Sequence, residues 1–125
     1  MGLFCFFLAG GEPFLFPNCF IFAANSKRCF MIFTNSTAIR QNDFKPLKHL
    51  SNTVIVVSIE GGQDAIPQKR PRRLPKGPKT LKRLTKLGTP NGISATNTHL
   101  NYEYWMNPEH ISNLIAQRIR TAVFI

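Results

Sequence analysis

Hydrophobic residues follow a clear pattern in three stretches of the chain. Residues 53–59 form a run rich in β-branched side chains that stops at Glu-Gly-Gly, which is typical of a buried strand. The nearest similar run is 29–34, and we expect the two segments to pair. Residues 108–123 instead place apolar side chains at helical spacing. Asn107 precedes them as a candidate N-cap, so the pattern predicts an amphipathic C-terminal helix.

The N-terminal third is apolar but interrupted. Nine of the eleven Phe lie in residues 1–35, and one Glu and two Pro divide this segment into short runs. None reaches the roughly 20 apolar residues of a transmembrane helix, which argues against a membrane span. Residues 3–9 resemble a short signal-peptide core, although no basic residue precedes them. With a signal, Asn35 becomes a glycosylation acceptor; the alternative is a set of short strands or a collapsed apolar cluster.

The basic residues are concentrated in one stretch. The chain has a net charge of +10, and nine of its sixteen Lys and Arg lie in residues 69–88, without an acid. Three Pro favour an extended conformation over 69–78. Such a stretch can act as a nuclear-targeting signal, neutralise phosphates of nucleic acid, approach anionic lipid, or serve as a solvated linker. The candidate nucleic-acid-binding residues are Lys69, Arg70, Arg72, Arg73, Lys76, Lys79, Lys82, Arg83 and Lys86.

These unlike stretches predict a chain without one shared core. We expect a mostly irregular or disordered fold, with the helix at about 108–123 and a short strand pair involving 53–59. The chain divides into a Phe-rich apolar segment (1–35), a short strand region (36–64), a basic Pro-rich disordered linker (65–101), and an aromatic patch with the C-terminal helix (102–125).

Candidate chemistry is sparse. The sequence holds no Ser-nucleophile, zinc-protease or phosphate-loop motif, so we expect no enzyme and no cofactor. Cys5, Cys19 and Cys29 lack the paired spacing of a zinc site, and the three His are scattered, so we expect no metal. Isolated cysteines among apolar residues are typical of unreactive thiols.

One segment resembles a known family. The sequence MNPEHISNLIAQRI, which opens residues 106–123, resembles the start of the gag polyprotein of plant gypsy-type retrotransposons. The resemblance implies that the chain is a fragment derived from a mobile element, with unrelated sequence upstream. It assigns no role to any residue.

The resulting functional expectation is modest. We expect a protein without a recognisable functional domain, with at most weak, nonspecific nucleic-acid binding through the basic stretch. The alternative is a small secreted or membrane-associated protein directed by its hydrophobic N-terminus. A third interpretation is a protein partner for the 108–123 helix. The compartment stays open: the nucleus if the basic run is a targeting signal, the secretory pathway under the alternative.

Overall fold

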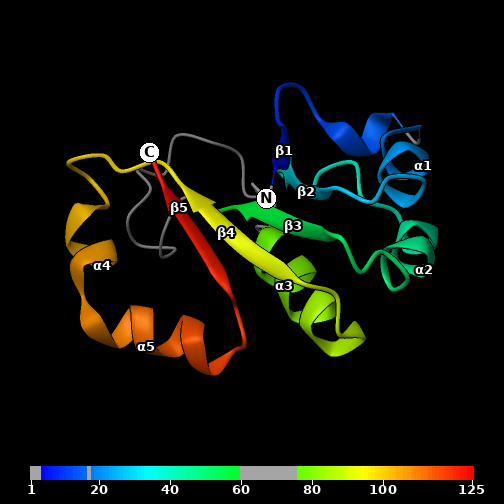
Figure 1. The fold of residues 1–125 in the computed structure, drawn as a ribbon. Coiled ribbons are helices and arrows are strands. Elements are labelled where there is room, and N and C mark those ends of the chain that lie inside the picture. The colour runs from blue at the N-terminus through cyan, green and yellow to red at the C-terminus, as the bar shows by residue number, and fades with distance from the viewer. Residues whose placement is uncertain (1–3, 17, 60–75) are drawn as a thin grey trace.

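Strands and helices alternate along the chain in the computed structural model, which describes residues 4–16, 18–59 and 76–125 (Figure 1). The strands are β1 (Cys5–Leu8), β2 (Cys29–Thr34), β3 (Thr53–Ser58), β4 (Asn91–Ala95) and β5 (Thr121–Phe124). The helices are α1 (Asn18–Ala24), α2 (Phe44–Leu47), α3 (Lys76–Leu87), α4 (Tyr102–Met106) and α5 (Pro108–Ala116), with short 3-10 helices η1 (Pro13–Leu15) and η2 (Gln41–Asp43).

The five strands form one parallel sheet in chain order, β1-β2-β3-β4-β5. Parallel neighbours cannot be joined by a tight turn, so the connections described between strands carry helices. Figure 1 shows α1 and α2 beside the β1–β3 half of the sheet and α4 and α5 beside β5. The predicted pairing of 29–34 with 53–59 is present, with Phe30 aligned on Thr53.

The two faces of the sheet differ because successive side chains of a strand point to opposite sides. Ile32, Ile55 and Ile93 are fully buried on the face that the helices cover. The other face carries Cys5 of β1 and its register partner Cys29 of β2. Helices α1 to α4 also contribute buried side chains to this core. These are Phe20, Phe44, Leu47, Leu81, Leu84 and Trp105.

The expectation of a mostly irregular chain is wrong. All four predicted segments contribute elements to the same sheet or its covering helices, and the supposed disordered linker contains α3 and β4. Pro78 does not prevent α3, because the third residue of a helix needs no intrahelical partner for its N–H. Leu84 is fully buried and Leu81 nearly so, so packing on the sheet supplies the stability that the short helix would lack alone.

The C-terminal helix is shorter than predicted. Asn107 caps it as expected, since its side chain accepts a hydrogen bond from the Glu109 N–H at 2.9 Å. The helix ends at Ala116, and Arg118 turns the chain with a left-handed φ of 61°. The apolar residues that continued the helical pattern then form β5, where β-branched Thr and Val pair with β4.

The N-terminal apolar run is part of the sheet. Strand β1 lies within residues 3–9, the run that resembles a signal-peptide core. Its Phe6 stacks on Phe30 of β2, with ring centroids 5.6 Å apart. This segment is therefore a structural strand of the folded chain. Among the described residues, no helix has the length and apolar character needed to cross a bilayer.

Candidate functional site

The carboxyl ends of the parallel strands lie at one edge of the sheet, where α/β proteins bind ligands. The loop after β1 begins there with Gly10 and Gly11, whose φ angles are 98° and 60°. Left-handed angles are accessible to glycine at little cost. Apart from its chain neighbours, no described residue has an atom within 4 Å of where a Cβ would stand on either glycine. The backbone of this turn is therefore open to close approach by another molecule.

Glu12 follows the two glycines and ties this loop to the next strand. Its side chain is only 6% exposed. Oε1 accepts hydrogen bonds from the Thr34 hydroxyl at 2.7 Å and the Phe14 N–H at 3.1 Å. Oε2 accepts one from the Asn35 N–H at 2.9 Å. All three donors are neutral, so the carboxylate is held in place by hydrogen bonds without a positive partner among them.

Ser36 is the unusual residue of the loop after β2. It has a φ of 65° and is 1% exposed, and its N–H donates to Thr34 Oγ1 at 3.0 Å. Its own hydroxyl has no hydrogen-bond partner among the described residues. A buried polar group left without a partner costs about 1–3 kcal/mol, and a non-glycine residue with this φ adds strain. Both features are typical of functional sites.

The loop after β4 completes the described part of this edge. The Asn97 N–H donates to the Ile125 carbonyl at 2.8 Å, which joins the ends of β4 and β5. The Asn101 side chain orders the same loop, donating to the Thr96 carbonyl at 2.8 Å and accepting from the Thr98 N–H at 2.8 Å. This edge therefore carries buried polar side chains, such as Ser36 and Asn101, beside exposed ones, such as Asn97.

The groups at this edge are suited to binding. One buried carboxylate, hydroxyls, amides and open backbone can recognise a small polar ligand, and the negative charge favours a cationic group on it. We call Gly10, Gly11, Glu12, Ser36 and Asn97 the edge residues.

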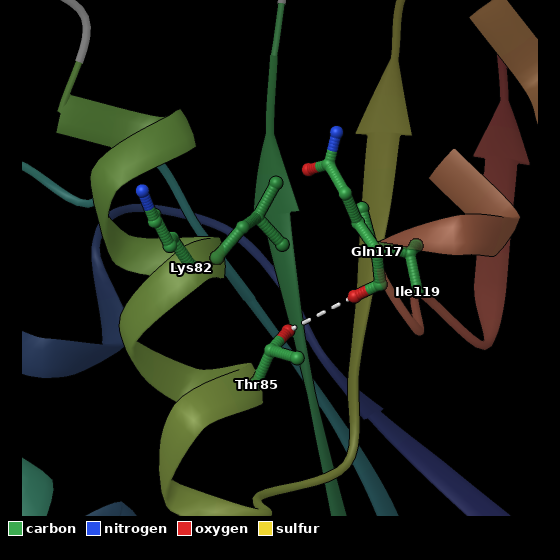
Figure 2. A pocket seen from close by; sticks show the side chains of 5 residues that line it. Lys82, Thr85, Gln117 and Ile119 are labelled. Atoms are coloured by element: carbon green, nitrogen blue, oxygen red, sulfur yellow. Dashed lines mark hydrogen bonds between the residues drawn. The ribbon is translucent and has the colours of Figure 1, made fainter. Parts of the chain in front are cut away.

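A separate pocket lies at the opposite, amino edge of the sheet (Figure 2). It has a volume of about 430 Å³ and lies between α3 and the segment that leads into β5. The Thr85 hydroxyl donates to the Gln117 carbonyl at 3.4 Å across it. Among the described residues that line it, only Lys82 is charged; these residues are Leu81, Lys82, Thr85, Gln117 and Ile119.

The basic residues singled out in the sequence do not form an extended arm where the structure describes them. Lys69, Arg70, Arg72 and Arg73 lie outside the described residues. Lys76, Lys79, Lys82, Arg83 and Lys86 belong to α3.

Two of these side chains have internal partners. Lys76 donates to the Thr37 carbonyl at 3.2 Å. Arg83 donates to Gln41 and lies over the Phe44 ring, 4.0 Å from its centroid. The aromatic patch is also structural in part, because Trp105 is 1% exposed and packs against Phe124.

The edge residues are not among the site residues predicted from the sequence. The expected signal-peptide core, residues 3–9, ends just before Gly10, and the expected glycosylation acceptor is Asn35, the neighbour of Ser36. A usable signal was present: a Gly-Gly-Glu turn between two apolar β-prone runs. It was passed over because Phe-rich runs of this length are equally typical of a signal peptide.

Comparison with known proteins finds similar solved structures and no matching family. No protein-family model and no curated protein matches the chain. Crystal structures of Streptococcus suis SuiB match it, among them SuiB bound to S-adenosylmethionine and SuiB bound to the precursor peptide SuiA. Each has a TM-score of 0.79 and 21% identity and covers 96% of this chain. The chain spans only 28–29% of the length of SuiB, so this likeness shows a shared fold.

This match corrects the functional expectation. Because 96% of the chain follows the fold of part of SuiB, the expectation of a fragment without a recognisable domain is wrong. None of these three structures is of a gag polyprotein, and the segment with the gag resemblance forms α5 and β5 of the folded unit. The prediction that the chain is not an enzyme is at odds with the match, which by itself concerns the fold alone.

Proposed function

We propose that the chain binds S-adenosylmethionine at the carboxyl edge of its sheet, as part of an enzyme that uses this molecule. The observation that carries the proposal is the buried hydroxyl of Ser36 at that edge, which the described residues leave without a hydrogen-bond partner. The fold shared with S-adenosylmethionine-bound SuiB supports the choice of ligand.

The edge residues fit the chemistry of this ligand. S-adenosylmethionine carries a positive sulfonium and a positive ammonium group, and the buried carboxylate of Glu12 has only neutral hydrogen-bond donors. Charges of opposite sign attract most strongly where water is excluded. The open backbone of Gly10 and Gly11 can receive polar groups of the ligand, and the Ser36 hydroxyl can exchange a hydrogen bond with it.

The test is calorimetric titration of the full chain with S-adenosylmethionine, repeated with the Ser36→Ala variant. The parent is expected to bind, and Ser36→Ala to bind about two- to tenfold more weakly, the value of one neutral hydrogen bond. Because the hydroxyl has no partner among the described residues, its removal breaks no hydrogen bond within that part of the chain. S-adenosylhomocysteine, which lacks the sulfonium charge, is expected to bind more weakly than S-adenosylmethionine.

Thr89→Val is the matched control. Thr89 also has a buried hydroxyl without a described partner, but it precedes β4 at the amino edge. This variant is expected to bind like the parent. Equal affinity of the parent and Ser36→Ala, or equal weakening by both variants, would contradict a site at the carboxyl edge.

A further inference from the structure

Two cysteine side chains meet on the face of the sheet opposite the one that carries Ile32 and Ile55. Cys5 of β1 and Cys29 of β2 are register partners in neighbouring parallel strands. The Cys5 thiol donates a hydrogen bond to Cys29 Sγ across 2.9 Å. Both residues are half-buried, so small molecules in solution can reach them.

The strand geometry is compatible with a disulfide. Neighbouring strands lie about 4.8 Å apart, within the Cα separation of roughly 4.4–6.8 Å found across disulfides. Register partners also point their side chains to the same side of the sheet. Bond formation therefore requires the two Sγ atoms to approach from 2.9 Å to about 2.0 Å.

We propose that Cys5 and Cys29 form a reversible intramolecular disulfide, with a low-molecular-weight disulfide such as oxidised glutathione as the oxidant. The Cys29 thiolate attacks one sulfur of the oxidant, which breaks its S–S bond and releases one small thiol. The Cys5 sulfur, having lost its proton to solvent, then attacks Cys29 Sγ and expels the second small thiol. The protein loses two electrons and two protons, and the oxidant becomes two thiols.

The environment of the pair determines the order of these attacks. Burial raises the pKa of Cys5 to about 11, and the hydrogen bond to Cys29 and the charge on Cys29 add to the increase. A Cys5 thiol that keeps its proton near neutral pH is the poorer first nucleophile of the two, so Cys5 attacks second.

The position of the pair gives the bond a structural consequence. Among the described strands, β1 has β2 as its only neighbour in the sheet, and it leads within a few residues into the Gly10–Glu12 turn. A Cys5–Cys29 bond fixes this edge strand to the body of the sheet. Cys19 is placed differently: its thiol donates to the Pro13 carbonyl at 3.4 Å and packs against the core.

The experiment treats the full chain with oxidised glutathione, then alkylates the remaining thiols and measures the intact mass and the cross-linked peptides. The untreated chain is expected to take three labels and the oxidised chain one, on Cys19. Peptide mapping should show Cys5 joined to Cys29. Cys19→Ser is the matched control and should form the same bond, whereas Cys29→Ser should form none.

Other outcomes overturn the proposal. These are three labels after treatment, stable glutathione adducts on Cys5 or Cys29, or a bond that includes Cys19. The same treatment in urea should give mixed pairings, because only the folded sheet aligns Cys5 with Cys29. A Cys5–Cys29 bond that forms as selectively in the unfolded chain would also contradict an origin in the sheet.

Discussion

Replacing Glu12 with Ala should unfold the chain at a markedly lower denaturant concentration. The buried carboxylate accepts three hydrogen bonds that join the loop after β1 to the end of β2. Thr34 keeps another partner when the carboxylate is removed, because its hydroxyl oxygen still accepts from the Ser36 N–H. The N–H groups of Phe14 and Asn35 lose their acceptor.

The magnitude follows from these contacts. Each N–H left without a partner costs about 1–3 kcal/mol, and the lost bond to the Thr34 hydroxyl adds about 1 kcal/mol. The release of a desolvated charge offsets part of the total. We expect a loss of about 3–5 kcal/mol, a large share of the roughly 5–15 kcal/mol that stabilises a domain. Glu12→Gln keeps one acceptor oxygen and should lose about half as much.

The assay is urea unfolding followed by circular dichroism, with the free energy extrapolated to water. Glu103→Ala is the control, since it removes a carboxylate from an exposed position on α4. The control should stay within about 1 kcal/mol of the parent. A Glu12→Ala loss no larger than that of Glu103→Ala would refute the role assigned to the carboxylate.

Three further predictions concern the sheet and its covering helix. Gly92→Ala should destabilise the chain by about 1–3 kcal/mol. The reason is that the added Cβ would stand 2.6 Å from the Thr121 carbonyl oxygen. An unchanged urea midpoint would contradict this close approach. Leu84→Ala should lower the free energy of unfolding by about 2–5 kcal/mol. Its control, Ile115→Ala, changes a side chain that is 67% exposed and should stay within about 0.5 kcal/mol of the parent. Equal losses would show that α3 does not cover the core. The rate at which Cys5 is alkylated, followed by peptide mass spectrometry, should keep rising as the pH approaches about 11, because only the thiolate reacts. A rate that levels off at the ordinary pKa of a thiol would contradict the raised pKa of Cys5.

The elements that the sequence predicted well are those whose local pattern agrees with their final place. The β-branched run of β3 and the apolar run of β2 carry strand signals, and both are central strands. Asn107 has a side chain that satisfies the exposed N–H groups of a helix start, so α5 was placed correctly at its beginning.

Other elements depend on contacts that no local pattern reveals. β4 reads Asn-Gly-Ile-Ser-Ala, a composition typical of a turn, yet all five residues are buried between two strands. Its glycine is needed because β5 approaches closely. α3 was obscured by neighbouring prolines and a high density of charge, although its buried Leu81 and Leu84 show the face that packs on the sheet.

The candidate site was beyond local analysis for a related reason. Glu12 and Thr34 are 22 positions apart and meet only because β1 and β2 are parallel neighbours. Likewise, only the placed loops show that the described residues leave the Ser36 hydroxyl without a hydrogen-bond partner. A parallel sheet brings together residues that follow different strands, so its binding edge is a property of topology more than of sequence.

The most direct test of the central claim is to follow the backbone amide signals of the ¹⁵N-labelled chain by NMR while S-adenosylmethionine is added. Binding at the carboxyl edge predicts the largest, saturable shifts at Gly10, Gly11, Ser36 and Asn97. Shifts centred instead on Thr85 and the other residues that line the amino-edge pocket, or no saturable shifts at all, would contradict it.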